Sequence, residues 1–130
     1  MDDPELQALC AMVGALIPCV VIIGLVWISE KQSRDRARRL LEAWLSPAQL
    51  EQFRTSGYFD VIGSDSGRIY RLRQGRQMNV DELDNRSKPL ALWCVLPEGR
   101  LPVCDIMLAQ KIALETDEKG TLAIAHKGSR

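Results

Sequence analysis

Residues 58–96, YFDVIGSDSGRIYRLRQGRQMNVDELDNRSKPLALWCVL, decide the fold of this chain. Their β-branched, aromatic and aliphatic residues form short runs, and the segments SDSG, QGRQ and DNRSKP separate these runs. Serine and aspartate hydrogen-bond to nearby backbone and glycine tolerates positive φ, so segments this short connect neighbouring antiparallel strands. The pattern predicts a roughly four-stranded antiparallel sheet.

The residues after this stretch predict a helix that packs against the sheet. Leu90 to Leu96 is apolar on both faces, which predicts a strand that is central or sandwiched between helices. Beyond the Pro97–Pro102 turn, Asp105 is expected to cap a helix, and Lys111 on that helix is expected to be solvated. Its apolar face is predicted to comprise Ile106, Leu108, Ala109, Ile112 and Ala113.

The predicted fold class is therefore α+β, with a module over residues 46–127 and a tail over residues 128–130. The last residues, HKGSR, are expected to be frayed. Ser46-Pro47-Ala48-Gln49 predicts the start of a short helix, with Ser46 as N-cap and Gln49 closing a capping box. That helix is expected to end before Gly57.

Residues 8–28, ALCAMVGALIPCVVIIGLVWI, contain no charged residue and span about 31 Å as a helix, the thickness of the hydrocarbon core of a bilayer. The leader, residues 1–7, is acidic and the apolar core is long, so a cleaved signal peptide is disfavoured. A buried helix of a soluble protein is the alternative, but such a helix seldom lacks a polar face over this length. We expect a retained transmembrane helix.

Residues 29–45 are predicted to form a basic amphipathic juxtamembrane helix continuous with the span, because apolar residues recur there at helical spacing. Basic residues close to a span favour the cytoplasmic side and attract anionic lipid. The basic residues in question are Lys31, Arg34, Arg36, Arg38 and Arg39. They predict an inner-membrane, single-pass protein with its N-terminus outside and its module in the cytoplasm.

Small residues recur along one face of the span and would let a second helix approach closely, which suggests self-association. They are Ala8, Ala11, Ala15 and Cys19. Small residues are also common in transmembrane helices that make no such contact.

The four cysteines do not predict a cofactor or metal site. Cys10 and Cys19 are too far apart along one helix to be bridged. Cys94 and Cys104 flank Gly99 symmetrically, so a hairpin there would bring them together, although a reducing cytoplasm favours free thiols. The sequence has no C-x-x-C pair and no second histidine.

A basic cluster on the second predicted strand is the strongest candidate for binding. It comprises Arg68, Arg71, Arg73 and Arg76 around Tyr70. A basic β-ribbon beside an aromatic ring could hold nucleic acid or an anionic headgroup. The alternative is a solvated face on which Asp81, Glu82 and Asp84 neutralise the arginines across the next strand pair.

The segments YFDVIGSDSGRIYRLRQGRQMNV, WCVLPEGRLPV and DIMLAQKIALETDE carry a resemblance. They resemble a group of small bacterial proteins of unknown function that share a compact α+β module. The resemblance covers roughly half of the chain, from Tyr58 to about Ala125. It implies a shared fold and a bacterial source, and it assigns no activity, ligand or catalytic residue.

No catalytic constellation, phosphate-cradling glycine loop or small-molecule site is evident in the sequence. Asp105 and Lys111 are six positions apart and nearly opposite on a helix, and His126, the single histidine, has no nucleophile at a motif spacing. The leading hypothesis is a membrane-anchored interaction module that localises a protein partner or its own assembly. The runner-up binds nucleic acid or anionic lipid through the basic cluster.

Overall fold

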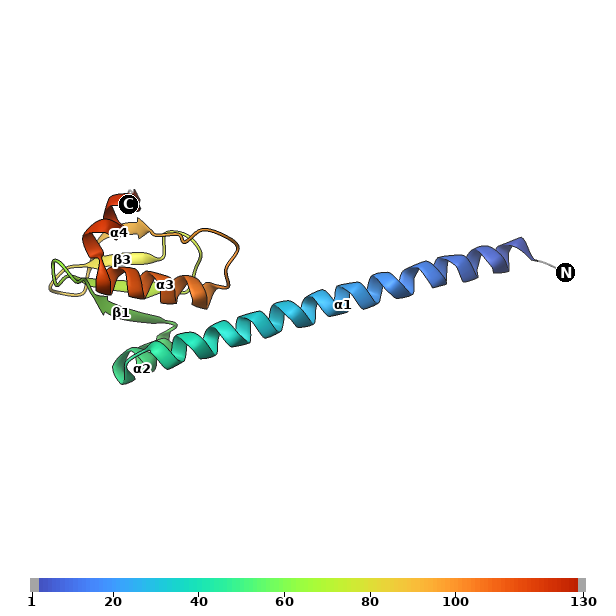
Figure 1. Cartoon of the computed structure of the whole chain (residues 1–130), viewed down its shortest axis with the longest axis horizontal. Helices are drawn as coiled ribbons and strands as arrows, with labels where there is room; N and C mark the ends of the chain where they lie inside the picture. Colours follow the sequence, from blue (N-terminus) through green and yellow to red (C-terminus); the bar gives the residue numbers. More distant parts are fainter. Residues whose placement is uncertain (1–2, 129–130) are drawn as a thin grey trace. The chain divides into compact units, whose positions relative to one another are not determined.

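The computed structural model describes residues 3–128 and confirms the α+β class (Figure 1). It consists of two units, and the boundary between them lies between Asp35 and Arg36. The helices are α1 (Pro4–Trp44), α2 (Pro47–Ser56), α3 (Val103–Thr116) and α4 (Glu118–Ile124), and the strands are β1 (Tyr58–Ile62), β2 (Ile69–Arg73), β3 (Val80–Leu83), β4 (Pro89–Cys94) and β5 (His126–Gly128).

Helix α1 is long and apolar enough to cross a membrane, as judged by its length and composition. It is unbroken at Pro18, and its large apolar side chains from Leu9 to Ile28 are all more than half exposed. A core helix of a soluble protein would bury these side chains. Their exposure does not favour the buried-helix alternative.

The capping box predicted for the second helix is confirmed. Ser46 Oγ accepts a hydrogen bond from the Gln49 N–H, and the Gln49 side chain accepts one from the Ser46 N–H. The helix ends at Ser56, and Gly57 closes it with φ of +72°, a left-handed conformation that glycine adopts without strain. Phe53 faces the core, as predicted, and is 2 % exposed.

The sheet is antiparallel with the strand order β1-β2-β3-β4-β5, so its strands are five and not the predicted four. The fifth strand is formed by His126–Gly128, which pairs with β4 through Leu92↔Gly128 and Cys94↔His126. The expectation of a frayed end is therefore wrong for His126–Gly128, and Ser129 and Arg130 lie outside the described residues. Main-chain hydrogen bonds hold β5 in place, and these do not require the β-branched or aromatic residues on which the prediction relied.

One face of the sheet carries the hydrophobic core, and α3 runs across it (Figure 1). Strand residues alternate between the two faces, and the core takes one set from β1, β2 and β3. The buried cluster comprises Leu41, Leu45, Phe53, Phe59, Val61, Tyr70, Leu72, Val80, Met107, Leu108 and Leu114.

Helix α3 buries only part of the predicted apolar face: Ile106 and Leu108 are buried, as predicted. Ile112 is 41 % exposed, whereas Met107 and Leu114 are fully buried. Lys111, expected to be solvated, is buried and pairs with Glu115. Gln110 is also fully buried, where it exchanges two hydrogen bonds with the Asn79 side chain and donates to the Val95 carbonyl. Asp105 does not cap this helix, which begins at Val103.

Strand β4 is not buried on both faces. It lies between β3 and β5, but Leu90 is 61 % exposed, so only one face of the strand packs against the core. The segment between β4 and α3 leads from strand to helix, so it does not form the β-hairpin around Gly99 that would bring Cys94 and Cys104 together.

Helix α2 protects the outer edge of β1. The N–H of Asp60 donates to the Gln52 side chain, and the Asp60 carbonyl accepts from the Gln49 side chain. These two amides take the places that a neighbouring strand would fill, which blocks edge-to-edge pairing at Asp60.

Candidate functional site

The sheet face opposite the core, here called the outer face, is the first candidate site. Strand register places Ile62, Ile69 and Leu83 in one row across this face. It places Asp60, Arg71, Asp81 and Leu92 in a second row beside the first. The outer face therefore has an apolar row and a charged row.

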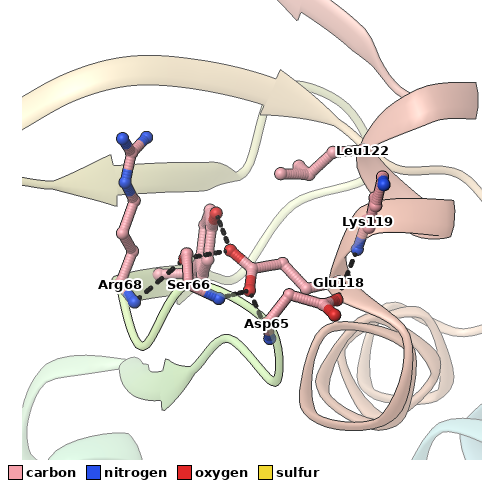
Figure 2. A pocket seen from close by; sticks show the side chains of 7 residues that line it. Asp65, Ser66, Arg68, Glu118, Lys119 and Leu122 are labelled. Carbon is pink, nitrogen blue, oxygen red and sulfur yellow. Dashed lines mark hydrogen bonds between the residues drawn. The ribbon is translucent and has the colours of Figure 1, made fainter.

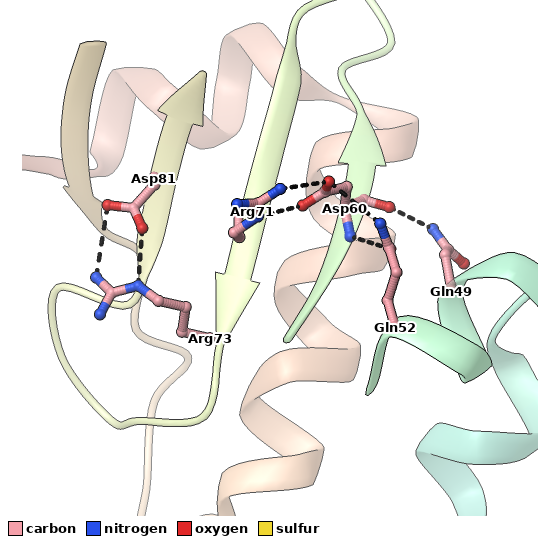
Figure 3. Close-up of polar contacts among 6 residues, drawn as sticks. All are labelled: Gln49, Gln52, Asp60, Arg71, Arg73 and Asp81. Carbon is pink, nitrogen blue, oxygen red and sulfur yellow. Dashed lines mark hydrogen bonds and ion pairs between the residues drawn. The ribbon is translucent and has the colours of Figure 1, made fainter. Parts of the chain in front are cut away.

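Three of the four arginines of the predicted basic cluster are paired with carboxylates, and Figure 3 shows the pairs of Arg71 and Arg73. Arg71 Nε lies 2.8 Å from Asp60 Oδ1, and Arg73 Nε lies 2.7 Å from Asp81 Oδ2. Arg68 pairs with Glu82, while Arg76 is exposed in the loop after β2.

The carboxylates that pair with the arginines differ in two respects from the alternative predicted from the sequence, in which Asp81, Glu82 and Asp84 neutralise the cluster. Asp60 supplies the partner of Arg71, and its carboxylate raises the pKa of that guanidinium mainly through their hydrogen bonds. In the described part of the chain, no arginine forms an ion pair with Asp84; its side chain accepts the N–H groups of Arg86 and Lys88 within the β3–β4 turn.

Tyr70 lies on the opposite face of the sheet from Arg71 and is fully buried. The ring that Arg71 contacts is that of Tyr58, whose centroid is 4.2 Å from the Arg71 guanidinium carbon. The structure therefore brings Arg71 and Arg73 onto one face and separates Tyr70 from them.

Several apolar side chains on the outer face are exposed, although Leu83 in the same row is buried. Ile62 is 64 % exposed, Ile69 39 % and Leu90 61 %. Ile62 and Ile69 also line a groove of about 550 Å³ beside the β1 edge, together with Gln49, Gln52 and other residues of α2. No described helix covers these side chains, so this face is available for a partner.

A second polar cluster, which sequence reasoning missed, surrounds Glu118 on α4 (Figure 2). The buried carboxylate accepts the backbone N–H groups of Asp65 and Ser66 at 2.8 and 2.7 Å. It also accepts the hydroxyls of Ser66, at 2.5 Å, and Tyr70, at 2.6 Å. The segment SDSG therefore forms a hairpin loop and an anion-binding cradle at the same time.

The cradle favours the ionised form of Glu118. Burial raises the pKa of this carboxyl, but the hydrogen bonds from Ser66, Tyr70 and the backbone outweigh burial and lower the pKa to about 2. Burial and the hydrogen bond to Glu118 raise the pKa of Tyr70. Only glycine fits at position 63, because a Cβ there would lie 2.4 Å from the Glu118 carboxylate.

The Glu118 cluster serves a structural role. Its donors are all directed at a carboxylate of the same chain, and this joins α4 to the β1–β2 loop. A cavity of about 230 Å³ adjoins it, lined by Arg68, Lys119, Leu122 and other residues of the cluster. Among residues 3–128, no group of three or more His, Cys, Asp or Glu side chains could hold a metal ion.

The predicted juxtamembrane residues all lie on α1 and are exposed: Lys31, Arg34, Arg36, Arg38 and Arg39. Arg38 bonds to Glu42 and lies over the Phe53 ring, so part of its role is to fix α1 against α2 within the second unit. Glu42 also accepts Arg54, and these hydrogen bonds lower its pKa.

The residues of the predicted small-residue face, Ala8, Ala11, Ala15 and Cys19, also belong to α1. Ala8, Ala11 and Cys19 are exposed. Cys94 and Cys104 are half-buried free thiols, and burial raises the pKa of Cys104.

No family model, no curated protein and no solved structure matches this chain.

Proposed function

We propose that the chain is a single-pass membrane protein whose α+β module binds another protein through the outer face of its sheet. The observation that supports this most strongly is the exposure of Ile62, Ile69 and Leu90 on a face that no described helix covers. Exposed apolar side chains gathered on one face are typical of protein–protein contact.

The charge arrangement also favours a protein over a polyanion. A nucleic acid or an anionic bilayer binds to uncompensated positive charge. On the outer face Arg71 and Arg73 each face a carboxylate, and Arg68 faces Glu82 at the end of the same strand pair. The net charge available to a phosphate there is small, which disfavours the runner-up.

The membrane part of the proposal is that α1 spans the inner membrane with the N-terminus outside and the module in the cytoplasm. Its support is the apolar, exposed segment of α1 followed by five basic residues. A C-terminal alkaline-phosphatase fusion should then be inactive, and a C-terminal fluorescent-protein fusion bright. An active phosphatase fusion with a dark fluorescent fusion would overturn the orientation.

The binding part is tested by cross-linking the full chain in native membranes. Replacing Ile62 and Ile69 by lysine puts positive charge on the outer face, so cross-linked products should be lost. Ile112→Lys and Ile124→Lys are matched controls, because these isoleucines are 41 % and 80 % exposed on α3 and α4. Loss of products in the controls, or retention in the outer-face variant, would contradict the proposal.

A further inference from the structure

We infer that the partner of the outer face is a second copy of this chain. The inference rests on the proposed function and identifies the occupant of the same surface. Three properties of the face carry it: balanced charge, remaining hydrogen-bond capacity, and an area suited to pairing in a membrane.

The charges of the outer face are self-complementary. Asp60 and Arg71 lie side by side on the face with side chains that are 22 % and 24 % exposed, and Arg73, two residues along the same strand, is 45 % exposed and pairs with the buried Asp81. A twofold axis brings the same surface of two copies together. With alternating charges, a rotated copy can set its guanidinium groups against carboxylates of the first, whereas a face of one sign would repel itself.

The paired arginines keep N–H donors that can bind a molecule facing them. Arg71 bonds Asp60 through Nε and Nη2, and a guanidinium carries five N–H donors. The Arg73 side chain is 45 % exposed and the Arg71 side chain 24 %. Intrachain pairing therefore leaves donors at the surface, and the adjacent apolar row of Ile62 and Ile69 supplies the area that two copies would bury.

The area of the outer face is enough for a weak dimer, and anchoring both copies in one membrane would strengthen their association. Five strands about 4.8 Å apart and about 17 Å long cover roughly 400 Å² in the plane of the sheet. This is about half of the roughly 800 Å² that each partner buries in a stable complex. Anchoring two copies in one membrane raises their effective concentration and gives them a common orientation, so a contact too weak in solution forms there.

The test uses the purified full chain, labelled for energy transfer and reconstituted in phosphatidylcholine vesicles over a range of protein-to-lipid ratios. Wild type should show transfer that rises with density. The double substitution Ile62→Lys, Ile69→Lys should weaken association at least tenfold, and the controls Ile112→Lys and Ile124→Lys should match wild type.

Charge reversal then tests the self-complementary arrangement itself. Asp60→Arg makes the face more positive, and Arg71→Glu makes it more negative. Each variant alone should associate less than wild type, and an equimolar mixture of the two should recover association. Recovery requires that the faces of two copies meet, and a simple loss of folding cannot produce it. Failure of the mixture to recover would overturn the inference.

The remaining outcomes separate the inference from the proposed function. If wild type stays monomeric in vesicles at every density, the inference is overturned. If the double substitution Ile62→Lys, Ile69→Lys nevertheless removes cross-links in native membranes, the proposed function stands and the partner is a different protein. If native cross-links survive in that variant, both fail. Transfer that persists in the outer-face variant and is lost in Ala11→Leu would assign self-association to α1 and overturn the inference.

Discussion

Replacing Glu118 by glutamine should destabilise the module in a pH-dependent way. The native pKa of Glu118 is about 2 against an ordinary value of 4.5, a difference worth about 3 kcal/mol of stability at neutral pH. Because the native pKa is depressed, this contribution is fully present above pH 4.5 and is lost as the pH falls toward 2. By the same relation, less than half of this contribution should remain at about pH 3.

The assay is chemical unfolding of the full chain in detergent micelles, followed by circular dichroism of the sheet, at neutral and acid pH. Glu118→Gln keeps the shape of the side chain and removes its charge, so the gap to wild type should narrow at acid pH. Glu98→Gln, at an exposed loop position, is the matched control and should stay within about 0.5 kcal/mol of wild type. A gap for Glu118→Gln that is equally large at both pH values would refute the assigned role of the ionised carboxylate.

Three further substitutions probe the packing around the two candidate sites, each measured by the same unfolding assay. Gly63→Ala should cost about 1–3 kcal/mol, because its Cβ would meet the Glu118 carboxylate at 2.4 Å; an unchanged midpoint would contradict the close approach. Gln110→Leu should cost about 1–3 kcal/mol because it leaves buried amide partners unsatisfied, and a stability gain would contradict this. Arg68→Gln should cost about 1–3 kcal/mol because it removes the guanidinium from a buried glutamate, whereas the exposed Arg76→Gln should change little; equal effects would show that the ion pair contributes nothing.

The sequence predicted the elements whose causes are local. The S-P-A-Q start of α2 fixes its own N-terminus through side chains within four residues, and the structure confirms it. The strands β1 to β4 were predictable because apolar runs and turn residues mark each of them. The class and most of the sheet followed from these signals.

The features that were missed depend on residues far apart in the chain. The SDSG segment signals a turn, but nothing near it shows that Glu118, more than fifty positions later, occupies its backbone N–H groups. Strand β5 forms through backbone pairing with β4, which His126-Lys127-Gly128 does not reveal. The partner of Arg71 was missed because Asp60 lies on the preceding strand, whereas the prediction considered only the acidic residues after Met78 as partners.

The arginine cluster shows why residue spacing alone misjudged a candidate site. Arg68 and Arg73 are themselves exposed, but their partners Glu82 and Asp81 are buried, so removing these arginines should affect the fold as well as any ligand. A loss of binding in such variants would not by itself locate a binding surface. Ile62 and Ile69 are better probes because exposed side chains there can change with little cost to the core.

The most direct test of the central claim is whether the outer face is covered in the native membrane. A single cysteine at Ile62→Cys or Ile124→Cys, in a chain whose own cysteines are replaced by alanine, reports accessibility through its rate of maleimide labelling. The account predicts that Ile62→Cys is labelled much more slowly in native membranes than after dilution into detergent, while Ile124→Cys is labelled equally fast in both. Equal rates for Ile62→Cys under the two conditions would show that nothing covers the outer face and would contradict the proposed function.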